Sequence, residues 1–382
     1  MRKSFYAAVF VLCSIATGKI AAQNSHVVFP GKAWEKASPE QLGWSPAKLE
    51  AARKYFETLP AGNAMVVDGG QVVAEWGDSS QRIKISSARK SLLSALYGVY
   101  AHTGKFDLNQ TLAQMGIDDD PPLTPQEKQA TLQMMLESRS GVYHPFIGGT
   151  PYMKAEQPPR GSHAPGTFWY YNEWDFNVLG SILEQRVNSK IGVEFRDRIA
   201  TPIHMQDFRA EDTYYIKATP QTASFEKSIY PMYHFRMSAR DLARFGYLYL
   251  RRGNWDGTQV IPSDWIDEST RAYSVAGYRA YAGGGESGGY GYLWWVDSYG
   301  LPVKNFSAAG SLGKYLIVIP EREMVVVYLN HTEWPDDAPL IPESELNQLP
   351  DVSRSQIGQF VTLLLDAQPG ARPTEEVSRS RR

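Results

Sequence analysis

Cysteine is almost absent from this chain. The single residue, Cys13, lies within the first 22 residues, so no thiol follows it. Disulfide bonds, thiolate metal sites and cysteine nucleophiles are therefore excluded from the rest of the chain. The seven histidines are scattered and form no His-Glu-x-x-His pair, which argues against a zinc hydrolase. We predict neither a metal nor a cofactor, and we keep His144, His163 and His234 as candidates for lining a cleft.

An excess of charge of either sign is also missing. The net charge is −2 over 382 residues, with 43% hydrophobic and 21% charged residues. This balance is typical of a globular protein, and it provides no basic surface for nucleic acid or for an anionic membrane. The length suits one large domain or two closely packed ones. We therefore expect a small-molecule substrate rather than a nucleic-acid partner.

The apolar run near the N-terminus, from Phe5 to Ala16, is too short to span a bilayer. Arg2 and Lys3 precede it, and the small residues of Ile20-Ala21-Ala22 follow it, as in a secretory signal. We expect residues 1–22 to be a cleaved signal peptide, which predicts a secreted or periplasmic protein without stable membrane insertion. Residues 371–382 are predicted to be a disordered tail.

A serine and a lysine three residues apart, Ser87 and Lys90, open an apolar segment that we predict to be a helix. Positions i and i+3 share one face of a helix, so the lysine ammonium can lie beside the serine hydroxyl. A serine becomes a nucleophile when a neighbouring base takes its proton, and the N-terminus of a helix favours a nearby oxyanion. We predict that Ser87 is an acyl-accepting nucleophile.

The Ser-x-x-Lys spacing alone is weak support, because it occurs four times in the chain. Ser45 precedes Pro46 and is typical of a helix cap. Ser224 is followed by no periodic apolar run, and Ser311 lies in a glycine-rich turn. Only Ser87 follows a predicted hairpin and begins a long helix with an apolar face. A plain helix cap remains the alternative for Ser87.

The remaining pattern predicts strands at both ends of the chain and helices between them. Helices are expected near 45–59, 124–138, 174–188, 238–253 and 352–365, and strands near 63–77, 291–296, 314–320 and 323–330. Such an order suggests an α+β fold in which both ends of the chain build one antiparallel sheet.

Two further motifs could complete a site around Ser87. Tyr170-x-Asn172 precedes a predicted helix, and a tyrosine held near a lysine can act as a base while an asparagine orients a carbonyl. Packing for Tyr170 and helix capping for Asn172 are the simpler alternatives. The small residues from Ser307 to Gly313 let the backbone approach a ligand, so the N–H groups of Ser87 and Ser311 could hold an oxyanion. A tight turn before a strand explains that stretch equally well.

Taken together and in this order, the motifs resemble the serine β-lactamase-like family. This family includes class C β-lactamases, penicillin-binding proteins, and related esterases and 6-aminohexanoate-dimer-hydrolase-like proteins. Flanking phrases such as GKFDLNQTL, MSARDLARFGYLYL and PEREMVVV are similar too. The resemblance implies an antiparallel sheet flanked by helices, with an inserted helical lobe. We expect a hydrolase domain over 23–370, with a sheet lobe at about 34–105 and 285–367 and a helical lobe at about 106–284.

The resemblance also implies roles for individual residues. Ser87 would attack a carbonyl, Lys90 and Tyr170 would handle its proton, and Asn172 would bind the substrate. The acyl-enzyme would then react with water. Ala308-Ala309-Gly310 would take the place of the family's Lys-Thr-Gly motif, which makes Ala308, Gly310 and Ser311 substrate-binding candidates.

Alanine at position 308 is a departure from this pattern, because the family's drug-binding members carry lysine there. That lysine helps to hold a substrate carboxylate. We therefore favour an ester or amide hydrolase over a β-lactamase or D-alanyl-D-alanine carboxypeptidase, which remains the alternative. Lys304, Lys314 or Arg139 could supply the missing cation. A non-catalytic binding protein on the same scaffold is a further alternative.

A rival nucleophile motif occurs at Gly285–Gly289, where Gly-Glu-Ser-Gly-Gly matches Gly-x-Ser-x-Gly around Ser287. In α/β-hydrolases this motif needs a strand before it and a helix after it. Here a glycine-rich loop precedes it and a predicted strand follows, and His331 is only a weak candidate partner. We consider this hypothesis much weaker than the one built on Ser87.

Overall fold

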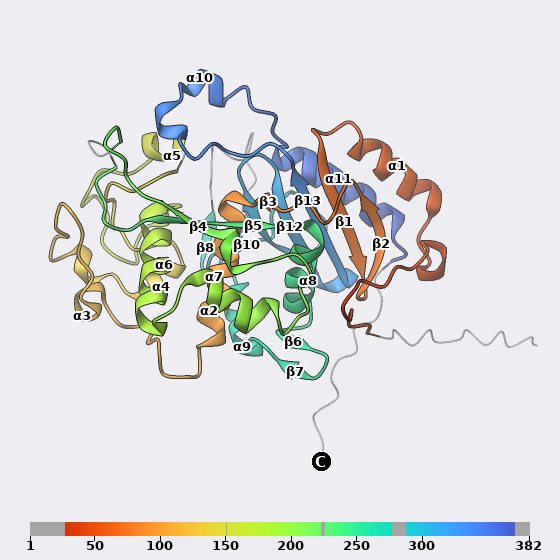
Figure 1. The fold of residues 1–382 in the computed structure, drawn as a ribbon, viewed down its shortest axis with the longest axis horizontal. Helices are drawn as coiled ribbons and strands as arrows, with labels where there is room; N and C mark the ends of the chain where they lie inside the picture. The colour runs from red at the N-terminus through yellow and green to blue at the C-terminus, as the bar shows by residue number, and fades with distance from the viewer. Residues whose placement is uncertain (1–26, 150, 223–225, 277–287, 371–382) are drawn as a thin grey trace, which may run out of the picture.

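The computed structural model describes residues 27–149, 151–222, 226–276 and 288–370. The predicted signal peptide, the predicted tail and Ser287 of the rival motif lie outside these residues. Figure 1 shows an α+β molecule, which confirms the predicted fold class. None of the helices in the described ranges combines the length and the apolar character that crossing a bilayer requires.

The main sheet has eight strands in the order β2-β1-β13-β12-β11-β10-β9-β8, all paired antiparallel. Its first two strands come from near the start of the chain and the others from its second half, so β1 pairs with β13 over its whole length, from Gly62↔Asn330 to Asp68↔Met324. The strands are β1 (Gly62–Asp68), β2 (Gln71–Trp76), β8 (Ser274–Ala276), β9 (Gly288–Tyr290), β10 (Trp295–Val296), β11 (Phe306–Gly310), β12 (Lys314–Ile319) and β13 (Met324–Asn330).

Alternating side chains along the central strands explain why helices cover both faces of this sheet. On one face, Val66, Ile317 and Val326 pack against α1 (Pro46–Phe56) and α11 (Arg354–Ala367). On the other face, residues such as Val67 and Leu316 join the core that contains α2 (Arg89–Val99) and α8 (Ala239–Leu250). The central strands are therefore buried on both faces, with α1 and α11 together on one side (Figure 1).

The helical region lies between the two parts of the sheet in sequence. Besides α2 and α8, its helices are α3 (Leu112–Met115), α4 (Leu132–Leu136), α5 (Pro151–Ala155), α6 (Glu173–Val187), α7 (Ile191–Phe195) and α9 (Ser263–Ser269). The predicted helix over 124–138 is wrong as one element. Thr124 and Glu127 do form the reciprocal hydrogen bonds of a capping box, but only a 3₁₀ turn follows. Thr131 then caps α4 separately.

The predicted strand at 291–296 is also shorter than expected, because only Trp295 and Val296 are extended as β10. Leu293 has a φ of +63°, a left-handed conformation that cannot continue a strand. Two small sheets complete the fold: β3-β5-β4, from β3 (Ile83–Lys84), β4 (Thr213–Ile216) and β5 (Met232–Met237), and the pair β6 (Asn254–Trp255) and β7 (Thr258–Gln259).

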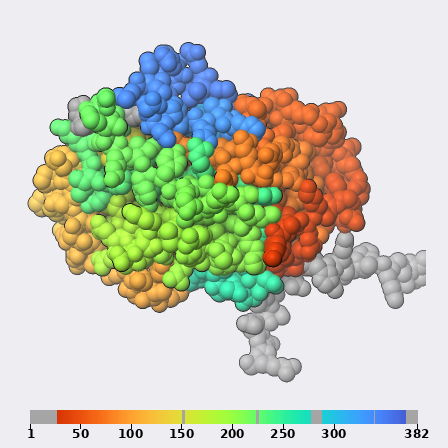
Figure 2. Space-filling model, in the orientation of Figure 1, coloured from red at the N-terminus to blue at the C-terminus, as the bar shows by residue number. Residues whose placement is uncertain are grey.

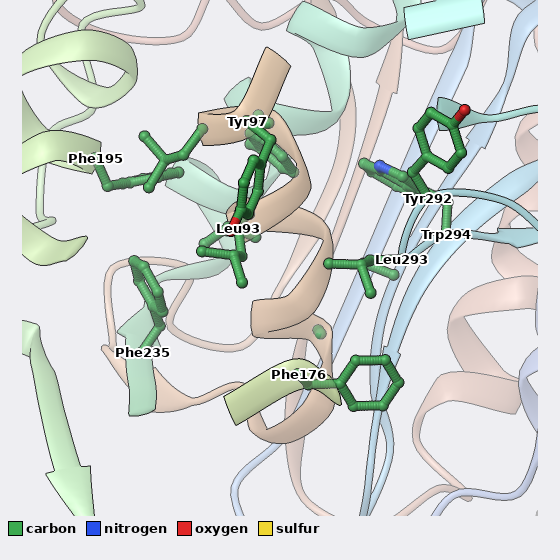
Figure 3. Packing of buried hydrophobic residues seen from close by; sticks show 14 of the residues in the cluster. Leu93, Tyr97, Phe176, Phe195, Phe235, Tyr292, Leu293 and Trp294 are labelled. Carbon is green, nitrogen blue, oxygen red and sulfur yellow. The ribbon is translucent and has the colours of Figure 1, made fainter. Parts of the chain in front are cut away.

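Helix α2 runs through the middle of the larger core. Figure 3 shows Leu93 and Tyr97 of this helix among aromatic rings from α6, α7, β5 and the β9–β10 loop. The Tyr97 hydroxyl donates to the Leu179 carbonyl at 2.7 Å, and the Ser91 hydroxyl donates to the Leu293 carbonyl at 2.7 Å. These contacts tie α2 to the β9–β10 loop and to α6.

Between β13 and α11 the chain makes a long excursion, which we call the 331–350 segment. It contains α10 (Glu343–Leu346) and lies across the top of the molecule in Figure 1. Arg236 of β5 donates two hydrogen bonds to the Glu333 carboxylate, at 2.6 and 2.7 Å. Lys84 of β3 forms an ion pair with Asp336. Charged contacts thus join this segment to the small β3-β5-β4 sheet.

Replacing Gly246 with valine is expected to destabilise the fold by about 2–4 kcal/mol, because α8 packs against the sheet at this glycine. A Cβ at this position would lie 2.5 Å from Leu316 Cδ1 and 2.7 Å from Val325 Cγ1. The matched control is Ala51→Val on the exposed face of α1, where only helix propensity, about 0.6 kcal/mol, is lost. Denaturant unfolding measures both variants, and equal losses would contradict this packing.

Candidate active site

Ser87 lies in a 3₁₀ turn, Ser86–Ala88, placed between the short strand β3 and helix α2. The helix itself begins at Arg89, so Ser87 precedes it rather than forming its first turn. Ser86 has a φ of +49°, a conformation that is uncommon for residues other than glycine. Ser87 is half-buried, and its backbone N–H belongs to the turn that leads into α2.

The structure brings Lys90 and Ser87 together. Lys90 Nζ donates to Ser87 Oγ at 3.0 Å, to the Tyr171 hydroxyl at 2.9 Å and to Glu173 Oε2 at 2.7 Å. The ammonium is also 4.3 Å from the centre of the Phe176 ring. A single buried amine therefore links a serine hydroxyl, a phenol and a carboxylate.

Burial is the main influence on the charge of Lys90. It lowers the pKa of the amine to about 7, against the attraction of Glu173, which raises it, and with a further lowering by Arg89. A lysine with such a pKa is partly neutral near neutral pH, whereas an exposed lysine is almost fully protonated. The neutral fraction can accept a proton from the neighbouring Ser87 hydroxyl.

The tyrosine at this site is Tyr171, and the prediction that Tyr170 lies beside Lys90 is wrong. The Tyr170 hydroxyl donates instead to the Met153 carbonyl at 2.6 Å. Consecutive residues of an extended segment point to opposite sides, so only one of the two tyrosines can face Lys90. Burial also raises the pKa of Tyr170 well above its usual value.

The shift by one residue moves Asn172 away from the site as well. Its side-chain amide donates to the Val142 carbonyl at 2.7 Å and to Asp175 Oδ1 at 3.0 Å, both inside the helical region. The next residue, Glu173, lies directly beside Lys90. The sequence gives little sign of this, because an acidic residue in the first turn of a helix is common for reasons of capping and dipole alone.

Glu173 is a fully buried carboxylate shared by two buried cations. It pairs with Lys90 through Oε2 and with the guanidinium of Arg89 through Oε1. Although burial alone would raise it, the two cations hold the pKa of Glu173 below its usual value. The carboxylate therefore stays ionised and joins the first turn of α6 to the first turn of α2.

Strand β11 brings the third predicted motif against the Ser87 turn. A Cβ on Gly310 would lie 2.3 Å from the Ile85 carbonyl oxygen and 3.0 Å from the backbone nitrogen of Ser87. Only glycine lets the strand approach so closely. Ala308 is buried, with 1% of its surface exposed. Ser311 follows the strand and lies beside Ser87 in the cleft.

Two cavities meet at Ser87, and Ser311 lines both of them. The first extends toward β5 and the 331–350 segment, where His234, Met232 and Trp334 line it. We call it the β5 cavity. The second is lined by Tyr171, Trp295, Ala309, Gly310, Tyr315 and Arg354. We call it the α11 cavity. A substrate could therefore occupy both sides of the Ser87 hydroxyl.

Comparison of the sequence with known protein families identifies the family of this chain. The family model described as Beta-lactamase matches residues 49–347, which is most of the chain. This chain belongs to the Beta-lactamase family. No curated protein shows significant similarity to it.

Solved structures show the same β-lactamase fold at low identity. A protein from Bacillus anthracis, named as a candidate 6-aminohexanoate-dimer hydrolase, is 20% identical, with a TM-score of 0.57 over 82% of this chain and 86% of that one. A penicillin-binding protein homologue from Caulobacter crescentus is 15% identical, with a TM-score of 0.54 over 80% and 98%. A class C β-lactamase is 11% identical, with a TM-score of 0.57 over 85% and 98%.

Lys304, Lys314 and Arg139 were considered as replacements for the lysine that the family's drug-binding members carry at position 308. None of them lines the β5 cavity or the α11 cavity. Lys304 is exposed and pairs with Asp297. Lys314 is buried and donates to the carbonyls of Leu312 and Thr332, while Arg139 contacts the Gly166 carbonyl and Glu137.

The cation that does line the α11 cavity is Arg354, from the first turn of α11. Its guanidinium carbon lies 4.1 Å from the centre of the Trp295 ring. Sequence reasoning missed Arg354, because α11 is nearly 270 residues away from Ser87 along the chain and carries no motif of its own.

The other predicted features can be placed more briefly. His234 lines the β5 cavity, as considered from the sequence, whereas the two ring nitrogens of His144 face the carbonyl oxygens of Pro145 and Pro121, at 2.7 and 2.8 Å. His163 contacts the Tyr143 hydroxyl at 3.0 Å, and His331 contacts Asn63 Oδ1 at 3.0 Å. Among the described residues, no group of three or more His, Cys, Asp or Glu side chains could hold a metal ion.

Changing Glu173 to glutamine is expected to destabilise the protein by at least about 3 kcal/mol, because two buried cations would lose their shared anion. Thermal or denaturant unfolding measures this loss. Asp197→Asn is the control, since it removes one carboxylate from an exposed ion pair with Arg196 and should cost less than about 1 kcal/mol. Similar losses of unfolding free energy in the two variants would mean that Glu173 does not stabilise the buried charges of Lys90 and Arg89.

Proposed function

We propose that this member of the Beta-lactamase family is a serine hydrolase that forms an acyl-enzyme on Ser87 and hydrolyses an ester or amide bond. The observation that carries the proposal is the contact of one buried amine, Lys90 Nζ, with both the Ser87 hydroxyl and the Tyr171 hydroxyl. A hydroxyl, a base of lowered pKa and a second proton carrier within hydrogen-bond reach are what nucleophilic catalysis by serine requires.

In the first half of the proposed reaction, Ser87 Oγ attacks the substrate carbonyl carbon and its proton passes to the neutral amine of Lys90. The backbone N–H groups of Ser87 and Ser311 donate to the oxyanion that develops. Collapse of the tetrahedral intermediate breaks the bond to the leaving group. That group takes the proton from Lys90 through the Tyr171 hydroxyl and departs as an alcohol or an amine.

In the second half, water attacks the carbonyl carbon of the acyl-enzyme. Lys90 and Tyr171 now accept the proton of the water, and the same N–H groups stabilise the second oxyanion. Collapse releases the carboxylic acid, and the proton returns to Ser87 Oγ. Glu173 takes no part in the proton transfer, and its charge keeps the Lys90 amine in position.

The proposed substrate class is based on Ala308, which occupies the lysine position of the family's Lys-Thr-Gly motif. Ala308 offers no charge, which supports a neutral ester or amide. A β-lactam or D-alanyl peptide is the second candidate, and the guanidinium of Arg354 in the α11 cavity is the observation that favours it.

We also propose that the protein is exported, which is supported by the signal-like pattern of residues 1–22.

A fluorophosphonate probe is expected to modify Ser87, because the probe reports a nucleophilic serine. Mass mapping of the labelled protein identifies the site. Ser87→Ala should lose labelling and the hydrolysis of p-nitrophenyl acetate while keeping its unfolding transition. Ser287→Ala is the matched variant and should retain both. Modification of Ser287 would support the rival motif, and the absence of any modification would support a non-catalytic binding protein.

Tyr171→Phe is expected to lower kcat by about 100-fold or more, because it removes the hydroxyl that carries protons between Lys90 and the leaving group. Tyr170→Phe, its neighbour, loses only the bond to the Met153 carbonyl and about 1 kcal/mol of stability. Steady-state hydrolysis of p-nitrophenyl acetate, with unfolding curves for both variants, makes the comparison. A large loss in Tyr170→Phe alone would reverse the assignment of the two tyrosines.

A further inference from the structure

The β5 cavity contains charged side chains, and each of them already has an opposite partner. Lys84 Nζ pairs with Asp336 and donates to the Trp334 carbonyl at 2.6 Å. Arg89 pairs with Glu173. Bringing a further charged group into this cavity would cost desolvation energy without a counter-ion to offset it. The charges of the cavity therefore do not select a charged ligand.

Two residues that line the same cavity each carry a neutral polar atom with no hydrogen-bond partner among the described residues. The two atoms are Nδ1 of His234 and Oγ of Ser86, both fully shielded from solvent. The two residues are 4% and 5% exposed. Buried polar atoms of folded proteins are nearly always hydrogen-bonded, so two orphans beside one cavity require a cause. A ligand group that meets both would provide one.

His234 is held in place as an uncharged ring. It lies on β5 with its ring centre 5.3 Å from that of Tyr214 on β4. Burial, together with Arg89, Lys84 and other nearby cations, holds the pKa of His234 well below its usual value. A neutral imidazole has one donor and one acceptor nitrogen, and a serine hydroxyl can also do both.

Apolar side chains form another part of the wall. Met153, Ile216 and Met232 lie on the side of the helical region and the small sheet, and Trp334 and Pro335 come from the 331–350 segment. Figure 2 shows this segment packed against the surface formed by the residues around β4 and β5. Hydrogen bonds made in such surroundings compete little with water and therefore discriminate strongly between ligands.

The position of the proton donor indicates which part of the substrate enters the β5 cavity. The leaving group must receive a proton from the Lys90–Tyr171 pair, and Tyr171 lines the α11 cavity. The leaving group is thus on the α11 side of Ser87. The acyl group, on the other side of the attacked carbonyl, extends into the β5 cavity.

We propose that His234 and Ser86 form a binding site for an uncharged hydrogen-bonding group, an amide or a hydroxyl, on the acyl part of the substrate. The site makes the enzyme select acyl chains that end in such a group over hydrocarbon chains of the same shape. This inference rests on the proposed acyl-enzyme chemistry at Ser87.

The test compares the p-nitrophenyl esters of glutaramic acid and of 5-methylhexanoic acid, which have the same shape but differ in a terminal amide. The ratio of kcat/KM for the amide ester to that for the hydrocarbon ester should be about 10 or more in the natural protein. His234→Leu should lower this ratio about tenfold, Ser86→Ala should lower it by a smaller factor, and His234→Gln should recover part of it.

Met232→Leu is the matched control, because it reshapes the same wall without changing a hydrogen-bonding group and should leave the ratio as it is. A natural ratio below 1, or an equal effect of His234→Leu on both esters, would overturn the inference. Fluorophosphonate labelling of every variant separates this outcome from failure of the proposed function. Labelled Ser87 without amide preference rejects only the new site, whereas unlabelled Ser87 in the natural protein rejects both.

Discussion

The buried ion cluster of Lys90, Arg89 and Glu173 is the interaction on which the site depends. Two cations and one carboxylate are removed from water at the junction of α2 and α6. Desolvation favours the neutral form of the lysine, and the carboxylate opposes it without cancelling it. Burial of the Lys90 amine costs folding free energy, and it also lowers the pKa of the amine to near neutrality.

Four distant parts of the chain meet at the α11 cavity, which begins at Ser87 beside this cluster. The Ser87 turn comes from the N-terminal part of the sheet region, Tyr171 from the start of α6, Gly310 from β11 and Arg354 from α11. Each is at or next to the end of a helix or strand whose remainder is packed in one of the two cores. Rigid elements therefore fix the positions of side chains that local sequence could not hold together.

Much of the fold could be predicted from the sequence, because alternation and caps are local signals. Ser45 and Ser238 do cap their helices, and the apolar runs of β12 and β13 are strands. What could not be predicted depended on distant contacts. The capping box at Thr124 is real, but only a 3₁₀ turn follows it, and a separate helix begins after Thr131.

The site shows the same division. The Ser87–Lys90 spacing identifies two side chains that do meet, since both lie on one local turn. The choice between Tyr170 and Tyr171 depends on which way an extended segment faces, and two adjacent tyrosines leave no local sign of it. Trp295, Arg354 and the partner of Lys90, Glu173, reach the cleft through tertiary structure alone.

The pairing of β1 with β13 along their whole length has a consequence for biosynthesis. A nascent chain carries Ser87 and Lys90 early, but the strand that completes the centre of the sheet ends only at Asn330. Helix α11, which supplies Arg354, is made later still. Sheet closure of such long sequence separation is a slow step in folding. The Ser87 turn thus stays without the strand and the helix that line its cleft until the chain has been made as far as Arg354.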